Sequence, residues 1–261
     1  MRFLTERPSH DLTYSDVFLV PQRSSVGSRL SVDLTGEDAC GLRMPLVAAN
    51  MTSVTGPRLA AAMARRGGLG VLPQDLALQD LDAAVQHVKS APTVYDPLVP
   101  VSAEATVGQA LARAYDSPGA VVTILDAEGR PSRCLPVSAL RHWLPDAPIS
   151  DVVADAIPAI DDEDVTDSRA AFALIEAAGV EAVAVRHHGE IVATLSARSA
   201  VRSTIYPPAL DAHGRLRVAA AVGITRDPAE RAAALVEAGV DVLVLDTAHG
   251  HQEQMVQAIR E

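Results

Sequence analysis

The chain has 261 residues and a formal net charge of −11, from 22 basic and 33 acidic residues. This acidic balance argues against nucleic acid or an anionic membrane as a partner, since both require a basic face. With 48% hydrophobic and only 3% aromatic residues, the chain is typical of a globular protein rich in small aliphatic side chains, which favours an α/β fold.

The N-terminal residues and the cysteines indicate a soluble, cytoplasmic protein. The first 16 residues are charged and lack the apolar core of a secretory signal. No uninterrupted apolar run reaches the length of about 18 residues that a membrane-spanning helix needs. Cys40 and Cys134 are too few for a disulfide framework or a zinc cluster, so reduced thiols are expected.

Strands and helices alternate in the first ninety residues, after an N-terminal arm. Apolar runs predict the strands, and amphipathic spacing closed by glycines or polar residues predicts the helices. The expected elements are strand 44–51, helix 56–68, strand 69–75 and helix 78–90.

A different block follows, bounded by proline-rich segments at 91–100 and 204–217. Within it, residues 101–131 and 160–191 each read as an acidic or threonine cap, a helix, a small-residue break, a strand and a turn. This weak repeat suggests two copies packed as a pair. The expected domain organisation is 1–92, then 93–205 with repeats at about 93–150 and 151–205, then 206–261.

After the block, strand 216–223, helix 227–239 and a strand within 240–246 resume the earlier alternation. The middle block therefore looks inserted into an outer series of four βα units. Four such units are half of an eightfold barrel or most of a doubly wound sheet, and periodicity does not choose between the two. In both folds, polar residues at the carboxyl ends of the strands line the site.

Two strand ends carry candidate site residues. Asn50 and Met51 lie at the carboxyl end of the first strand, where the alternative is a helix-capping turn with Thr55 as the cap. An amide directly after four apolar residues would need buried partners. Asp246 closes the last strand, where a carboxylate can accept hydrogen bonds from ribose hydroxyls. The alternative is that Asp246 caps the next helix.

His249 and His251 could act as acid/base groups or as ordinary loop residues, and with no third ligand nearby we expect no metal site. Cys40 precedes the first strand and Cys134 lies inside the middle block. Without a neighbouring histidine or helix N-terminus to lower its pKa, each thiol is expected to be inert. The chain contains no G-x-G-x-x-G after a strand, no phosphate-binding P-loop and no nucleophile elbow.

Five segments outside the middle block resemble the IMP dehydrogenase/GMP reductase family in order and spacing. They are "LTYSDVFLVPQRSSV" (12–26), "MPLVAANMTSVTG" (44–56), "GGLGVLPQD" (67–75), "GRLRVAAAVG" (214–223) and "AGVDVLVLDTAHGH" (238–251). The middle block falls where many members carry a tandem pair of CBS repeats.

This resemblance implies the N-terminal half of a (β/α)8 TIM barrel with an inserted tandem CBS (Bateman) domain. It implies an oxidoreductase of purine nucleotide metabolism that uses NADP or NAD at C2 of the base, through a thioimidate on a cysteine. Asn50 and Met51 would border the purine nucleotide substrate. Asp246 would bind the ribose of the nicotinamide half, with Thr247 and Gly250 shaping that pocket. The complete protein would be a homotetramer or octamer.

The resemblance leaves the direction of the reaction open. "AANM" resembles GMP reductases, but Thr52 replaces an aspartate common to both enzymes, Gln74 stands where reductases have lysine, and "DTAHGH" resembles bacterial dehydrogenases. The mixture is most similar to an actinobacterial, CBS-bearing GMP reductase-like subgroup. GMP reductase, converting GMP to IMP with NADPH, is therefore the first reading. IMP dehydrogenase, converting IMP to XMP with NAD, is the alternative.

The family's catalytic cysteine loop, its monovalent-cation site and its mobile flap would all follow the fourth strand. We therefore expect no catalytic residue in this chain, no turnover from it alone, and exposed apolar surface beside 216–223 and 240–246. Ala139 and Ser199 replace the aspartates that bind ribose in CBS repeats, so ATP or GTP binding there is a hypothesis. A third reading is a non-catalytic, nucleotide-sensing module.

Overall fold

The computed structural model describes residues 6–36, 38, 40–114, 117–165, 167–225 and 227–261. The chain divides into two compact units, one up to Asp33 and one from Leu34 to Glu261. The first is an extended arm whose short 3-10 turns, Tyr14–Asp16 and Arg29–Ser31, contain no buried residue. Among the helices described, none is long and apolar enough to cross a membrane.

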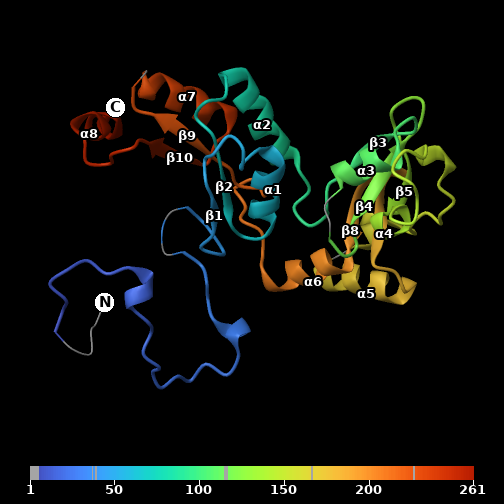
Figure 1. Ribbon diagram of the computed structural model, residues 1–261, viewed down its shortest axis with the longest axis horizontal. Coiled ribbons are helices and arrows are strands. Elements are labelled where there is room, and N and C mark those ends of the chain that lie inside the picture. The colour runs from blue at the N-terminus through green and yellow to red at the C-terminus, as the bar shows by residue number, and fades with distance from the viewer. Residues whose placement is uncertain (1–5, 37, 39, 115–116, 166, 226) are drawn as a thin grey trace. The chain divides into compact units, whose positions relative to one another are not determined.

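Four parallel strands form the main sheet of the second unit, in the order β1-β2-β9-β10 (Figure 1). They are β1 (Val47–Ala48), β2 (Leu69–Leu72), β9 (Ala219–Gly223) and β10 (Val242–Asp246). Strands from both ends of the sequence thus lie side by side. The α/β class and the parallel arrangement predicted from the sequence are confirmed.

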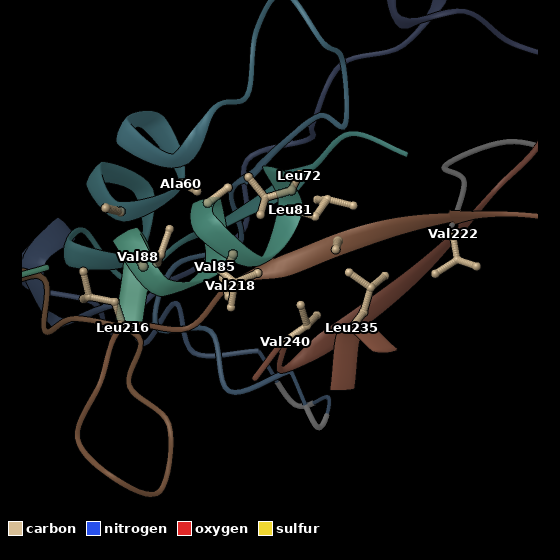
Figure 2. Packing of buried hydrophobic residues seen from close by; sticks show 14 residues of the cluster. Ala60, Leu72, Leu81, Val85, Val88, Leu216, Val218, Val222, Leu235 and Val240 are labelled. Carbon is tan, nitrogen blue, oxygen red and sulfur yellow. The ribbon is translucent and has the colours of Figure 1, made fainter. Parts of the chain in front are cut away.

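Helices α1 (Pro57–Arg65), α2 (Leu78–Ser90) and α7 (Pro228–Ala238) supply the core against this sheet. Because successive strand residues point to opposite faces, Leu72, Ala220 and Val222 join the helix side. Leu69, Val71, Ala219 and Ala221 form a second cluster with Leu42 on the other side. Figure 2 shows the helix-side cluster, where α2 contributes Leu81, Val85 and Val88 and α7 contributes Leu235.

Helix α1 packs closely against β2, and this is possible because position 70 on the strand is a glycine. A Cβ atom on Gly70 would overlap the backbone of Ala60. Ala60, Ala61 and Ala64 are all buried, so small side chains on the helix match the glycine on the strand.

The segment between α2 and β9 contains two three-stranded units of the same topology. The first unit comprises β3 (Pro100–Ser102), α3 (Val107–Arg113), β4 (Val121–Leu125), β5 (Pro131–Pro136) and α4 (Val137–Leu140). The second comprises β6 (Ala159–Asp161), α5 (Ser168–Ala178), β7 (Ala182–His187), β8 (Glu190–Ser196) and α6 (Ala197–Ile205). In each, the first strand pairs in parallel with the second, and the second pairs antiparallel with the third.

Each three-stranded unit has its own hydrophobic cluster, and a third cluster joins the two. Val121 and Cys134 of the first unit pack with Ala182 and Ala184 of the second. The two three-stranded units thus have the same strand order and share an interface.

The edges of the parallel sheet only partly match the sequence prediction. Val47 on β1 and Leu243 on β10 are exposed, as expected for strands with one neighbour. Apolar exposure beside 216–223 was also expected, and this is wrong: β9 lies between β2 and β10, and Ala219 to Val222 are fully buried. The expected strand 44–51 is reduced to β1, because only Val47 and Ala48 pair with β2.

An ionic cluster lies at the amino ends of β9 and β10. Lys89, at the end of α2, places its Nζ 2.9 Å from Asp211 Oδ2 and 2.7 Å from Asp241 Oδ2. The Lys89 and Asp211 side chains are 3% and 8% exposed, and Asp241 also accepts a bond from the Val218 N–H. The cluster ties the end of α2 to the segments that begin β9 and β10, across the whole insertion.

Candidate functional site

The carboxyl ends of the four parallel strands deliver polar side chains to one edge of the sheet. Asn50 follows β1 by two residues, Gln74 follows β2 by two, Gly223 ends β9 and Asp246 ends β10. Since the strands are parallel and in register, with Asp246 opposite Gly223, these groups converge. All four are half-buried.

Asp246 is the centre of this group. Its Oδ2 accepts a 2.7 Å hydrogen bond from Asn50 Nδ2 and a 3.0 Å bond from Gln74 Nε2. Asn50 thus finds the partner that its position requires, and Asp246 binds across the sheet instead of capping a helix. The N-cap of the next helix, α8 (Glu253–Arg260), is Gln252. Among the described residues, no hydrogen bond reaches Asp246 Oδ1.

Gln74 is itself fixed by its surroundings. Arg231 on α7 donates through Nη2 to the carbonyls of Gln74 and Leu76, at 2.7 and 2.9 Å. A Cβ atom on Gly223 would overlap Gln74 Oε1, so the lack of a side chain at position 223 leaves space for the Gln74 amide. The sequence showed Gln74 only as a departure from the family pattern, and Arg231 carried no signal because helical arginines are usually solvent-facing.

The other predicted site residues lie in the flanking turns. Met51 is 57% exposed in the turn after β1. Thr247 Oγ1 accepts hydrogen bonds from the Gln252 side chain and, at 3.4 Å, from the His249 N–H, which organises the turn after β10. Gly250 lies in that turn and is exposed, with open space where a Cβ atom would stand. No hydrogen bond joins these three residues to Asp246 in the described chain.

The alternative reading of the first strand end, with Thr55 as a helix cap, is wrong. Gly56 is the N-cap of α1, and Thr55 is buried with its hydroxyl donating to the Ala49 carbonyl at 2.5 Å. This bond closes the turn that presents Asn50. Thr52 instead reaches across to Asp75, at 3.1 Å.

The histidines and cysteines considered in the sequence make no catalytic arrangement among the described residues. His249 and His251 are exposed, and His249 Nδ1 accepts a bond from the His251 N–H within their own turn. Burial raises the pKa of Cys134, against an opposing hydrogen bond with Thr123. Burial, followed by the nearby Asp38 carboxylate, raises the pKa of Cys40. A raised pKa suppresses the nucleophilic thiolate in both cases.

The arrangement at Asp246 fits the binding of a ligand hydroxyl. Two neutral amide donors hold one carboxylate oxygen and leave the charge on the group, while the second oxygen retains its capacity to accept hydrogen bonds. This is the requirement for binding a ribose hydroxyl at the end of a parallel strand.

Comparison with known proteins assigns the chain to a family. A family model described as the IMP dehydrogenase / GMP reductase domain matches residues 11–261. GMP reductase of Mycobacterium tuberculosis (strain ATCC 25618 / H37Rv) is 45% identical over 269 residues, covering 100% of this chain and 54% of the relative. Inosine-5'-monophosphate dehydrogenase of Aquifex aeolicus is 33% identical, covering 96% of this chain and 52% of the relative. The chain thus spans about half the length of the curated relatives it matches.

Solved structures agree with this result. GMP reductase C318A from Trypanosoma brucei in complex with guanosine 5'-monophosphate aligns with a TM-score of 0.58 and 25% identity, covering 95% of this chain and 54% of that one. The T. brucei enzyme in complex with guanosine 5'-triphosphate aligns with a TM-score of 0.56 and 26% identity, covering 95% and 62%. With its sequence matched over residues 11–261 and its strand-end site formed around Asp246, the chain belongs to the IMP dehydrogenase / GMP reductase family.

Proposed function

We propose that this chain is the N-terminal part of a GMP reductase, which converts GMP to IMP with NADPH at C2 of the base. The observation that carries the proposal is the Asp246 carboxylate, held by Asn50 and Gln74 with one oxygen left for a ligand. The relative at 45% identity is named a GMP reductase, whereas the matched IMP dehydrogenases are 30% to 33% identical. IMP dehydrogenase, acting on IMP with NAD, is the second candidate.

Each strand-end residue has a role in this proposal. NADPH would supply the hydride, and Asp246 Oδ1 would accept a hydrogen bond from the ribose next to the nicotinamide. Asn50 would border the purine nucleotide with Met51, and its bond to Asp246 would link the two ligand positions. Thr247 and Gly250 would shape the pocket, where the absence of a side chain at position 250 leaves room for the sugar.

The proposal places the reacting cysteine outside residues 1–261. Cys40 lies before β1, at the amino end of the sheet, and Cys134 is buried in the first three-stranded unit. Cys40 packs with Leu42, Leu69 and Val71, and Cys134 packs with Val121, Ala182 and Ala184, away from the residues that bind Asp246. Residues 1–261 alone would therefore position ligands without turning them over, and any monovalent cation would also be held by other residues.

The four βα units would form half of a (β/α)8 barrel, completed by a further polypeptide segment that covers the exposed edge of β10. The two three-stranded units would be a tandem CBS domain, spanning 93–205 between the barrel segments 1–92 and 206–261. Binding of ATP or GTP by this domain is part of the proposal, although Ala139 and Ser199 lack the carboxylates that would bind ribose. The complete enzyme would be a cytoplasmic homotetramer or octamer.

Assays of the intact protein with GMP plus NADPH and with IMP plus NAD test the reaction. Turnover of GMP supports the proposal, and turnover of IMP alone would replace it with the second candidate. Purified residues 1–261 should show neither activity. If this fragment turns over either nucleotide, the placement of the reacting cysteine is wrong.

Asp246→Ala in the intact protein tests the site. We expect the cofactor KM to rise at least about tenfold, as for the loss of a hydrogen bond to a charged group, while GMP affinity changes much less. Glu230→Ala, which removes a carboxylate from the first turn of α7, serves as the control. Equal losses for cofactor and nucleotide would contradict the assignment of Asp246 to the cofactor.

A further inference from the structure

Arg231 connects helix α7 to the loop that carries Gln74. Its Nη2 donates to the Gln74 carbonyl at 2.7 Å and to the Leu76 carbonyl at 2.9 Å. Both acceptors lie in the loop between the end of β2 at Leu72 and the start of α2 at Leu78. Because they are main-chain oxygens, the two bonds hold the backbone from which the Gln74 side chain extends.

The stability of α7 does not explain the position of Arg231. The arginine is the fourth residue of the helix, which begins at Pro228, and the helix dipole disfavours a cation near the N-terminus. Arg231 Nε is also buried, with no hydrogen-bond acceptor among the described residues, and an unpaired buried donor costs free energy. The bonds to the loop are therefore the interactions that Arg231 gains at this place.

Helix α7 is itself held by packing. Leu235 is buried in the helix-side cluster with Leu81 and Val85 of α2, and Gln86 Nε2 donates to the Ala238 carbonyl at 3.0 Å. Since Arg231 precedes Leu235 by four residues, the two side chains leave the helix on the same side. The guanidinium thus fixes the loop after β2 relative to a packed helix.

Gln74 extends this constraint to Asp246. Its Nε2 lies 3.0 Å from Asp246 Oδ2, and Asn50 Nδ2 donates to the same oxygen at 2.7 Å. Two donors on one oxygen restrict the rotation of the carboxylate. Oδ1 is then the oxygen turned toward a ligand. Three residues from α7, the β2 loop and the end of β10 form one chain of contacts.

We propose that Arg231 is a positioning residue for cofactor binding, which sets the orientation of the Asp246 carboxylate through Gln74. The inference rests on the proposed function, in which Asp246 binds the ribose next to the nicotinamide. Arg231 itself would contact neither cofactor nor nucleotide. Its effect should therefore pass through Gln74 and appear in cofactor binding alone.

Calorimetric titration of the intact protein, first with IMP as the proposed product and then with NADPH, tests this role without turnover. Arg231→Met and Gln74→Ala should each weaken NADPH binding about three- to tenfold, as for the loss of one hydrogen bond. The double variant should bind NADPH no more weakly than Gln74→Ala, because both changes break the same path. IMP affinity should stay within about twofold, since IMP does not bind at Asp246 Oδ1.

Two further variants separate this role from a general loss of structure. Arg113→Met removes a comparable bond, from Arg113 Nη1 to the Pro100 carbonyl at 2.9 Å, and should leave NADPH binding unchanged. Arg231→Lys retains the charge and most of the alkyl chain but loses the planar fork, so it should weaken NADPH binding by a smaller factor than Arg231→Met.

The outcome for Asp246→Ala in the same titration distinguishes this inference from the proposed function. If Asp246→Ala weakens NADPH binding while both Arg231 variants bind as the wild type does, Arg231 has no positioning role and the proposed function stands. Additive losses in the double variant, or equal losses for IMP and NADPH, also overturn the inference. If Asp246→Ala leaves NADPH binding unchanged, the assignment of Asp246 to the cofactor fails, and the role of Arg231 fails with it.

Discussion

At the amino end of the parallel sheet, Asp211 and Asp241 bind the ammonium group of Lys89, whereas at the carboxyl end Asp246 binds two neutral amides. Lys89 is the only lysine in the chain, and it is buried. Asp211 also accepts bonds from Arg215 Nε and from the His213 and Arg215 N–H groups, and Asp241 accepts from the Val218 N–H through the same oxygen that binds Lys89. Asp246 retains its charge and an unbonded oxygen. The carboxylates at the amino end are paired with a buried cationic partner and fasten the fold, whereas the carboxylate at the other end is bound only by neutral amides, which suits a group that receives a ligand.

The largest effect should come from Lys89→Met, which leaves Asp241 without its cation and leaves Asp211 with Arg215 alone. Breaking a buried ion pair on one side costs about 3–5 kcal/mol, so the free energy of unfolding should fall by that amount. Urea unfolding measures it. Arg130→Met breaks an exposed pair with Asp126 and should cost no more than about 1 kcal/mol. Similar losses in the two variants would show that the buried cluster does not fasten the fold.

A smaller effect is expected from Asp241→Asn. The Asp241 carboxylate accepts hydrogen bonds from Lys89 and from the Val218 N–H. The asparagine side chain has the same shape as the aspartate but carries no charge. Because Asp211 still binds Lys89, the loss should be that of one hydrogen bond to a charged group, about 1.5–3 kcal/mol. The same urea experiment measures this. A loss as large as that of Lys89→Met would mean that the three groups act as one unit.

The cluster also predicts acid sensitivity. Burial raises the pKa of Asp211, but hydrogen bonds from Lys89 and from the Arg215 and His213 N–H groups lower it by more, so it lies below its usual value. A carboxyl whose folded-state pKa is depressed stabilises the fold above its unfolded-state pKa, which is about 3.9. This stabilisation should disappear as the pH falls from about 4 toward the folded-state pKa. Unfolding measured from pH 6 to 2.5 should show a shallower decline for Lys89→Met.

Local pattern predicted much of this fold. Helix α2 has the expected limits, Leu78–Ser90, because Leu81, Val85 and Val88 mark its buried face. The expected strand 44–51 was too long. As an edge strand, β1 has β2 as its one neighbour, and only Val47 and Ala48 pair with it. The expectation of an exposed β9 failed for a related reason: strand order, which periodicity does not encode, places β9 inside the sheet.

The site was only partly predictable because its partners are far apart in the sequence. Asn50 and Asp246 are separated by 196 residues, and Lys89 lies 122 and 152 residues from its two carboxylates. Strand-end positions and the family resemblance predicted Asn50 and Asp246 as candidates, and the structure brings the two side chains into contact. Gln74 and Arg231 are equally part of the site, but an amide after a strand and an arginine on a helix are common outside binding sites.

The smallest effect on stability should come from Asp246→Asn, and this variant tests the comparison most directly. The bonds to Asn50 and Gln74 are made by neutral donors to a half-buried group, so their weakening should cost under about 1.5 kcal/mol. Asn50→Ala, which removes a donor but leaves the carboxylate, serves as the control in the same urea experiment. If Asp246→Asn costs as much as Asp241→Asn, then Asp246 is a structural carboxylate like those at the amino end. If it unfolds nearly as the wild type does, the carboxyl end of the sheet retains a charge that the fold does not need, as expected of a group kept for a ligand.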